Sequence, residues 1–343
     1  MTPKRRRSRL CDVAELAGTS VATASRALNR SGYIAQETMD KVLKAAHQLN
    51  YQPNLQARGL RQKNSRLVGL LIPNMQDAYY MALADSLSLI MIRHGYHLLV
   101  FSSRDDPEYE KKMLHDMAGR AIDGLFWVPS NLDKELVHYL NDQQIPTISL
   151  VRRVQDDLLD TVIFEDLIGS QKAVEHLISL GHRYIGFIGG TIRHSSYRDR
   201  LEGYMKAMSN ADIPILNSLV KIGKTLDRWG EEATLELIEQ DPKPTALFIG
   251  SCTLVPGVIK VLTDHNFHLP DDMSLVCFDD LEWFQYYTPS ITAVSTNYEI
   301  LAEEAARLFF RRIEDMETST SKPILRRIEF NLMIRASSQP LIR

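Results

Sequence analysis

The sequence has 343 residues, of which 44% are hydrophobic and 24% are charged. This composition is typical of a globular chain of two or three domains, at about 150 residues per domain, and it excludes a disordered or fibrous protein. The net charge is −3, but residues 1–66 carry 13 Lys or Arg against four Asp or Glu, so the remainder is acidic. The basic N-terminal part predicts a polyanion-binding module fused to a second unit.

Cysteine usage and the start of the chain indicate the compartment. Cys11, Cys252 and Cys277 are an odd number of cysteines at no metal-ligand spacing, which is typical of a reducing environment. No apolar stretch approaches the roughly 18 residues of a membrane span. No apolar segment follows the charged residues 4–7, as it would in a secretion signal. We therefore expect a cytoplasmic protein that does not contact a membrane.

The first 50 residues predict short helices. Apolar residues at helical spacing indicate helices over 10–17 and 39–49, and Ser20 is placed to cap another helix that ends near Asn29. Gly18 permits a tight turn between the first two helices. This pattern predicts a helix–turn–helix whose second helix enters the major groove of DNA. The alternative, a generic helical hairpin, is disfavoured by the basic charge and by the linker that follows.

A linker is predicted over 51–65, where few residues could build a core. Pro53 marks its start, because the residue before a proline avoids the helical conformation. After Arg66, short apolar runs alternate with helical stretches. Such runs are typical of parallel strands buried on both faces, and two sheets suit the remaining length better than one. The runs are 67–72, 97–101, 124–128, 146–151, 161–164, 184–188, 246–249 and 275–278.

Further short motifs follow the helix–turn–helix in order along the chain. They are Leu49–Asn54, Gly95–Tyr96, Asp106–Glu108, Asp123–Gly124, His176–Gly190, Arg200–Tyr204, Pro244–Phe248 and Phe278–Asp280. Together they resemble the LacI/GalR family of bacterial transcription regulators. The resemblance implies an all-α DNA-binding head, then an α/β core of two parallel-sheet subdomains like the periplasmic binding proteins, with a small effector bound between the subdomains.

The resemblance also implies which residues bind DNA. The family's base-reading residues match Val21, Ala22 and Arg26, and its phosphate-contacting residues match Ser20, Thr23, Ser25 and Asn29. Arg26 has the chemistry to bond a guanine edge, whereas Val21 and Ala22 offer only apolar contact. In the hinge, Asn54, Ala57 and Leu60 match DNA-binding positions. Leu60 would insert into the minor groove beside its dimer mate, and Gly59 would keep the free hinge unfolded.

The family's effector residues match less completely. The positions carried over are Tyr79, Tyr80, Arg152, Arg200, Ser251 and Asp279. Arg200 and Asp279 agree with the family, but Arg152 stands where an acid is usual and Ser251 where asparagine is usual. Substitutions at effector positions, in a chain that otherwise keeps the family's motifs, indicate an altered ligand or a weakened effector site. The sequence does not decide between these two readings.

The arginines of this cleft allow two readings. Arg152, Arg153 and Arg200 need counter-charge, because an uncompensated buried cation is costly. Asp279 and Glu165 could supply it, in which case the cleft binds a neutral sugar. Alternatively the ligand supplies it through a carboxylate or phosphate, which arginine holds bidentately. The neutral-sugar reading and the anionic-ligand reading carry about equal weight, with a slight preference for an anionic sugar derivative.

The sequence therefore predicts a repressor of carbohydrate-utilisation genes that binds pseudo-palindromic double-stranded DNA as a homodimer. Its expected parts are a head (1–50), a hinge (51–65), an N-subdomain (66–163 plus 293–323) and a C-subdomain (164–292 plus 324–343). The eight residues after Arg335 are too few for tetramerising heptads. No metal-ligand spacing and no phosphate-binding, nucleophile-elbow or zinc-protease motif is present, so we expect no enzyme, metal or cofactor. The rivals are a transport-type sugar-binding protein and a sugar kinase with a DNA-binding appendage.

Overall fold

A computed structural model describes most of the chain, namely residues 8–29, 31–51, 65–120, 122–131, 133–154, 158–224, 228–315 and 322–341. The chain divides into two compact units, residues 1–65 and 66–343. The hinge positions predicted to bind DNA, Asn54, Ala57 and Leu60, lie outside the described residues.

The first unit is built from short helices around a core of small side chains. Its described helices are α1 (Leu10–Leu16), α2 (Val21–Asn29) and α3 (Gln36–Gln48). Ala14 and Ala24 are buried between them, and alanine at these positions lets short helices pack closely. Gly18 adopts a φ of +62°, a conformation that favours glycine, and so makes the turn between α1 and α2. The hydroxyl of Ser20 accepts the N–H of Thr23 at 3.1 Å and caps α2 as expected.

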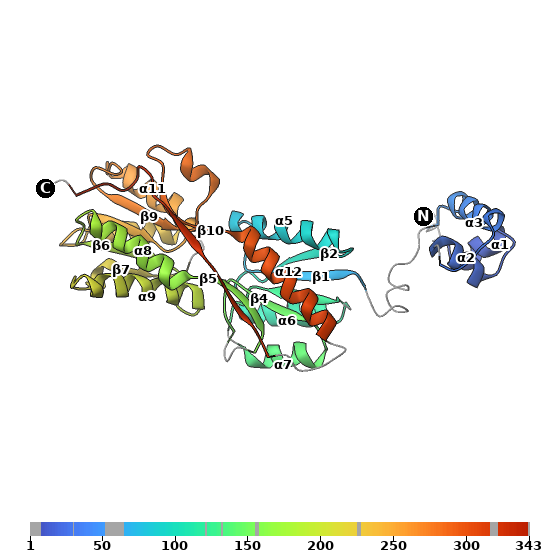
Figure 1. The fold of residues 1–343 in the computed structure, drawn as a ribbon. Helices are drawn as coiled ribbons and strands as arrows, with labels where there is room; N and C mark the ends of the chain where they lie inside the picture. Colours follow the sequence, from blue (N-terminus) through green and yellow to red (C-terminus); the bar gives the residue numbers. More distant parts are fainter. Residues whose placement is uncertain are drawn as a thin grey trace, which may run out of the picture. The chain divides into compact units, whose positions relative to one another are not determined.

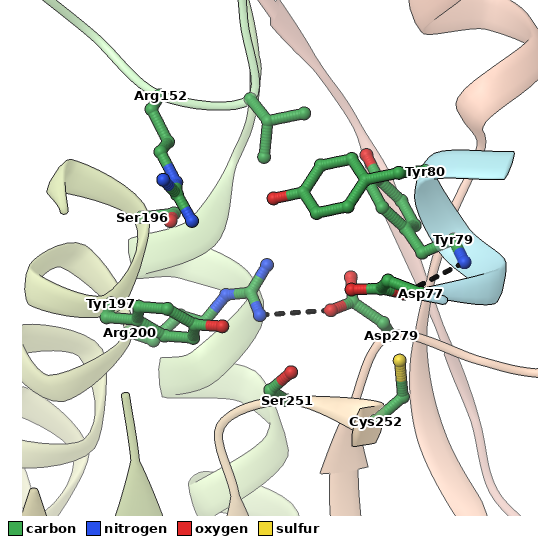
Figure 2. A pocket seen from close by; sticks show the side chains of 11 residues that line it. Asp77, Tyr79, Tyr80, Arg152, Ser196, Tyr197, Arg200, Ser251, Cys252 and Asp279 are labelled. Atoms are coloured by element: carbon green, nitrogen blue, oxygen red, sulfur yellow. Dashed lines mark hydrogen bonds and ion pairs between the residues drawn. The ribbon is translucent and has the colours of Figure 1, made fainter. Parts of the chain in front are cut away.

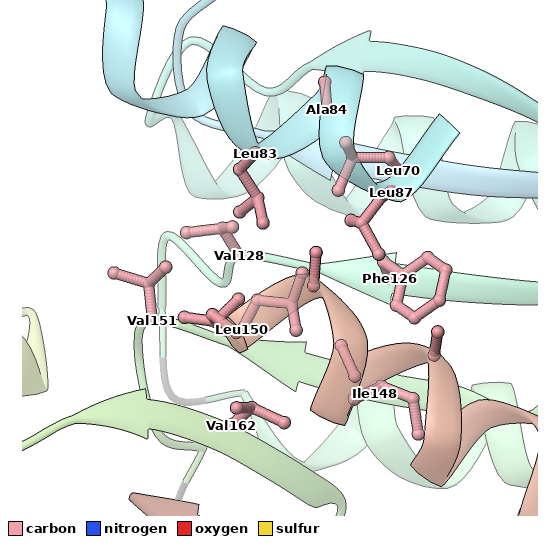
Figure 3. Packing of buried hydrophobic residues seen from close by; sticks show 14 of the residues in the cluster. Leu70, Leu83, Ala84, Leu87, Phe126, Val128, Ile148, Leu150, Val151 and Val162 are labelled. Atoms are coloured by element: carbon pink, nitrogen blue, oxygen red, sulfur yellow. The ribbon is translucent and has the colours of Figure 1, made fainter. Parts of the chain in front are cut away.

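The second unit begins with a parallel sheet in the order β11-β5-β4-β3-β1-β2 (Figure 1). Its strands are β1 (Leu67–Ile72), β2 (His97–Ser102), β3 (Gly124–Trp127), β4 (Thr147–Leu150), β5 (Asp160–Phe164) and β11 (Leu325–Ile328). One face packs on α5 and α12, and the other on α6 and α7. These helices are α5 (Ala78–Arg93), α6 (Pro107–Ala118), α7 (Lys134–Asp142) and α12 (Tyr298–Asp315). Figure 3 shows Leu83 and Leu87 of α5 against Phe126 and Leu150 of the sheet.

The other sheet has the order β12-β10-β9-β8-β6-β7, in which only β12 is antiparallel to its neighbour among the described strands. Its strands are β6 (Ile185–Gly189), β7 (Val220–Ile222), β8 (Ala246–Ile249), β9 (Ser274–Phe278), β10 (Thr292–Thr296) and β12 (Phe330–Met333). Helices α8 and α9 cover one face, and α10 and α11 cover the other. They are α8 (Asp166–Ser179), α9 (Ser195–Asn210), α10 (Trp229–Ile238) and α11 (Val255–Asp264).

The described strands place the passages between the sheets after Phe164, after Thr296 and at Glu329. The last two differ from the boundaries expected from the sequence, at 292 and 323. The reason is that β10 and β11 are not continuous apolar runs. β11 reads Leu-Arg-Arg-Ile and is an edge strand beside β5 among the described strands, and both of its arginine side chains are exposed. Figure 1 shows the β11–β12 segment, coloured red, running from one sheet to the other.

Helices α8 and α9 approach so closely that one position accepts only glycine. A Cβ on Gly203 would collide with the carbonyl oxygen of Leu167 and would lie 2.7 Å from Cβ of Ser170. Backbone atoms cannot move aside as a flexible side chain does. Gly203 therefore sets the distance between these helices, which explains the glycine in the Arg200–Tyr204 motif.

We expect Gly203→Ala to lower the free energy of unfolding by about 1–3 kcal/mol, because overpacking outweighs the usual gain of alanine in a helix. The matched control is Gly119→Ala, whose added Cβ would meet nothing closer than 3.5 Å. Urea denaturation of both variants and of the wild type measures the effect. A Gly203→Ala chain as stable as the wild type would show that the helices can separate at no cost.

Candidate functional site

Helix α2 exposes the side chains that were predicted to bind DNA. Ala24 and Ala27 are buried in the core of the first unit, which fixes the opposite face of α2 toward solvent. That face and its edges carry Ser20, Val21, Ala22, Thr23, Ser25, Arg26 and Asn29, each exposed or half-exposed. Val21 is 48% exposed, so its apolar side chain is available for contact. Such a surface suits apolar and hydrogen-bonding contacts to base edges.

The basic charge of the N-terminal part does not come from the helices themselves. The described residues 8–29 and 31–51 carry four basic and four acidic side chains, so their formal charges cancel. The excess lies in residues 1–7, at Arg30 and in the segment 52–66. The chain therefore carries its phosphate-attracting charge beside the helix–turn–helix rather than on it.

A pocket in the second unit lies where strands of both sheets end. Its lining residues follow the carboxyl ends of β1, β4, β6, β8 and β9, the position at which open α/β sheets bind ligands. The lining comprises Asp77, Tyr79, Tyr80, Val151, Arg152, Ser196, Tyr197, Arg200, Ser251, Cys252 and Asp279. The structure thus brings together all six predicted effector residues. Figure 2 shows Tyr79 and Tyr80 at the start of α5 facing Tyr197 and Arg200 of α9.

Arg200 is the buried cation at the centre of this pocket. Its Nε donates to Oδ1 of Asp166 at 2.7 Å, and its Nη1 donates to Oδ2 of Asp279 at 3.0 Å and to the carbonyl of Gly250 at 2.8 Å. The guanidinium also lies 3.8 Å from the centre of the Phe278 ring. Burial raises the pKa of Asp166 to about 7, although the neighbouring Arg200 opposes that rise.

The other two arginines are also paired with carboxylates of the chain. Nη1 of Arg152 donates to Oδ1 of Asp105 at 2.7 Å and to the carbonyl of Pro129 at 3.0 Å. Nη2 of Arg153 donates to both carboxylate oxygens of Asp199, at 2.8 and 2.7 Å.

This pairing removes the basis for expecting an anionic ligand, because each cation already has its counter-charge. Glu165, which was expected to supply counter-charge to the arginines, is half-exposed ahead of α8. Its buried neighbour Asp166 supplies that charge to Arg200 instead.

The pocket is closed in this arrangement. Its volume is about 20 Å3, enough for a single water molecule. Among the described residues, the hydroxyl of Tyr79 and Nε of Arg152 are buried without a hydrogen-bond partner. Burial raises the pKa of Asp77 to about 6, where the carboxyl can donate as well as accept. Aromatic rings with a few unsatisfied polar atoms around one space are typical of a small-molecule site.

Several pocket residues were not predicted from the sequence. Ser196 and Tyr197 lie four and three residues before Arg200 on α9, and helical spacing alone would have placed all three on neighbouring parts of one face. Asp77 caps α5 by accepting the N–H of Tyr79 at 3.0 Å. The partners Asp105, Asp166 and Asp199 carried no local signal, because each pairs with a residue more than 30 positions away.

Within the ranges that the structure describes, no group of His, Cys, Asp or Glu side chains is arranged to hold a metal ion. In the same ranges, no helix combines the length and the apolar character needed to cross a bilayer.

A helix–turn–helix unit joined to a core of two α/β subdomains with a pocket between them defines a ligand-responsive DNA-binding regulator. The family described as "Bacterial regulatory proteins, lacI family" matches residues 9–54, and that described as "Periplasmic binding protein-like domain" matches residues 174–338. The HTH-type transcriptional repressor PurR of Haemophilus influenzae (strain PittEE) is 30% identical over 334 residues, covering 96% of this chain and 98% of that protein. The chain belongs to the LacI family of bacterial transcription regulators.

Other similar proteins agree with this assignment. Catabolite control protein A of Priestia megaterium is 29% identical over 321 residues, covering 93% of this chain and 97% of that protein. The regulator CelR in complex with cellobiose has a TM-score of 0.73 at 25% identity, covering 96% of this chain and 100% of that one. The lac repressor dimer bound to operator has a similar fold, with a TM-score of 0.83 at 24% identity and coverage of 97% and 100%. The chain is a DNA-binding transcriptional repressor and not an enzyme.

A buried acid that the sequence did not single out holds the rim of the cleft. The carboxylate of Glu110, on α6, accepts the backbone N–H of Ser130 at 3.1 and 2.9 Å. The preceding carbonyl, that of Pro129, accepts Arg152. Burial raises the pKa of Glu110 to about 7 from an ordinary value of 4.5.

We expect the stability of the wild type relative to Glu110→Gln to fall as the pH rises. The folded-state pKa exceeds the unfolded one, so the stabilisation is complete below about pH 4.5 and is lost as the pH rises through about 7. The shift corresponds to about 3 kcal/mol, and the glutamine variant lacks this dependence but keeps an acceptor for Ser130. Thermal unfolding of both chains from pH 5 to pH 8 measures it. Parallel curves across that range would contradict an elevated pKa.

Proposed function

We propose that the protein is a homodimeric repressor of carbohydrate-utilisation genes in the bacterial cytoplasm. It binds a pseudo-palindromic operator through α2, and a small effector in the cleft controls this binding. The observation that carries the proposal is the pocket at the carboxyl ends of both sheets, in a chain that also exposes the DNA-contacting face of a helix–turn–helix. Two-fold symmetry of the dimer would place two copies of α2 on the two half-sites of the operator.

In the DNA complex, α2 lies in the major groove. Arg26 bonds a guanine edge, and Val21 and Ala22 make apolar contacts, which is supported by the exposure of these three side chains. Ser20, Thr23, Ser25 and Asn29 contact phosphates around them. The hinge positions Asn54, Ala57 and Leu60 belong to this proposal through the family resemblance alone.

We expect Arg26→Ala to weaken binding to the preferred sequence by about 1–3 kcal/mol and to relax the preference at one base pair. The matched control is Arg6→Ala, which removes a charge from the basic segment ahead of α1 and should weaken all sequences alike. Selection from a random DNA library identifies the operator, and titrations of operator and random DNA compare the variants. An equal loss on both kinds of DNA for Arg26→Ala would remove this residue from base recognition.

The effector is proposed to be a neutral, hydroxyl-rich ring such as a sugar. Arg152 and Arg200 are already neutralised by Asp105, Asp166 and Asp279, so a further anion would add uncompensated negative charge. The rings of Tyr79, Tyr80 and Tyr197 offer apolar faces to a sugar ring, and Asp279 and Ser251 offer bonds to its hydroxyls. The complex of the related regulator CelR with cellobiose fits this class of ligand.

We expect neutral mono- or disaccharides to raise the melting temperature of the wild type, because a ligand at 100 times its dissociation constant adds about 2.7 kcal/mol of stability. Tyr79→Phe, which removes only the unpartnered hydroxyl, should weaken the responding sugar by about tenfold. Tyr109→Phe, at an exposed position on α6, is the matched control. A shift with sugar acids or sugar phosphates alone would contradict a neutral effector.

A further inference from the structure

The two walls of the cleft are joined by side chains of this chain itself. On the wall that belongs to the first sheet, Asp105 follows β2 and Arg153 follows β4. On the opposite wall, Arg193 and His194 precede α9, and Asp199 lies in its second turn. These five residues meet in pairs that cross from one wall to the other, and we call them the cross-cleft clasp.

Asp105 is the most connected member of the clasp. Its Oδ1 lies 2.7 Å from Nη1 of Arg152 on its own wall and 3.3 Å from Nε2 of His194 on the other. Nη2 of Arg193 donates to the carbonyl oxygen of Asp105 at 3.2 Å and lies 3.8 Å from Oδ2. Burial alone would raise the pKa of Asp105, but His194 and Arg152 hold it below its usual value. The carboxylate is therefore charged, and it faces the guanidinium of Arg152 on its own wall and that of Arg193 on the other.

The backbone holds Asp105 in an uncommon conformation at this place. Arg104 and Asp105 both have a φ of +56°, which costs energy in residues other than glycine. The hydroxyls of Ser102 and Ser103 accept the N–H groups of Arg104 and Asp105, each at 3.3 Å, and so fix this turn. A strained turn that is supported on both sides aims the carboxylate across the cleft.

Arg153 forms the second half of the clasp. Its guanidinium donates to both oxygens of Asp199, and its backbone N–H donates to the hydroxyl of Ser195 at 2.8 Å. The side chains of Arg153 and Asp199 are 30% and 13% exposed, so water screens this pair less than a surface pair. Because Nη2 of Arg153 lies within hydrogen-bond distance of both oxygens of Asp199, the pair breaks when the walls separate.

We propose that the cross-cleft clasp holds the core closed when no ligand is bound, so that closure is the resting arrangement. An effector then acts by shifting the population away from the clasped arrangement, and it must interact differently with the two arrangements. The regulatory part of this inference rests on the effector proposed above, but closure itself requires neither effector nor DNA. A test without either molecule therefore separates the clasp from the sugar proposal.

The separation of the walls can be measured in the full chain by electron–electron resonance between two spin labels. Lys112→Cys on α6 and Met205→Cys on α9 place exposed labels on opposite sides of the cleft. Cys11→Ser removes the exposed native thiol, while Cys252 and Cys277 are buried and stay unlabelled. Mixing with excess unlabelled chain limits each dimer to one labelled copy.

We expect the clasped chain to give one narrow distance distribution without ligand. Asp105→Asn combined with Arg153→Gln should move a majority of molecules to longer distances, and each single variant should broaden the distribution. Asparagine tolerates positive φ, so Asp105→Asn removes the charge and keeps the turn. Glu304→Gln, which breaks a pair with Arg307 inside α12, is the matched control and should leave the distances unchanged.

Two outcomes would overturn the proposal. One is a broad or long distribution in the clasped chain without ligand, which would mean that the core rests open. The other is a double variant that folds, as shown by its circular dichroism, and gives the same distances as Glu304→Gln. If the double variant does not fold, Arg153→Gln alone decides, because that side chain is partly exposed and its backbone bond to Ser195 is retained.

Discussion

The cleft depends on the burial of one cation, the guanidinium of Arg200. It bonds Asp166 at the start of α8, Asp279 after β9 and the carbonyl of Gly250 after β8, so it fixes the ends of separate elements relative to one another. A buried charge that loses a partner is strongly destabilising, which forces these elements to keep their arrangement. Gly203, three residues along the same helix, lets α9 lie close enough to α8 for Arg200 to reach Asp166.

Buried parallel strands and amphipathic helices could be predicted from the sequence, because their apolar residues follow local patterns. The predicted strands of both sheets are present, while β7, β10, β11 and β12 were missed. β11 and β12 lie at sheet edges and carry exposed side chains, so they lack a continuous apolar run. The predicted effector residues meet in one pocket, but their counter-charges could not be predicted. Asp105, for example, pairs with Arg152 across 47 positions, and only the fold brings them together.

The distribution of charge separates attraction to DNA from recognition of its sequence. The described residues of the first unit carry no net formal charge, whereas the other residues of the N-terminal part are strongly basic. Phosphate contacts supply most sequence-independent affinity, and base-edge contacts supply discrimination. Because the described part of this unit carries no net charge as a whole, it adds little attraction to random DNA. We therefore propose that the exposed Val21, Ala22 and Arg26 of α2 contribute mainly to the choice of sequence. The opposite sign of the core, which is acidic, disfavours its own association with DNA.

The charged pairs across the cleft connect the pocket to regulation. With the pocket reduced to the volume of one water molecule, a sugar ring can enter only if Tyr79, Tyr80 or the cross-cleft clasp moves. If a ligand requires the unclasped arrangement, its apparent affinity is its intrinsic affinity multiplied by the fraction of molecules in that arrangement. A small unclasped fraction therefore weakens binding. Arg153 and Asp105 then influence the effector's affinity without touching it, since they set that fraction. The family's usual acid at position 152 would repel Asp105, whereas the arginine found here attracts it. The substitution that first suggested an anionic ligand is thus explained by an acidic partner within the chain.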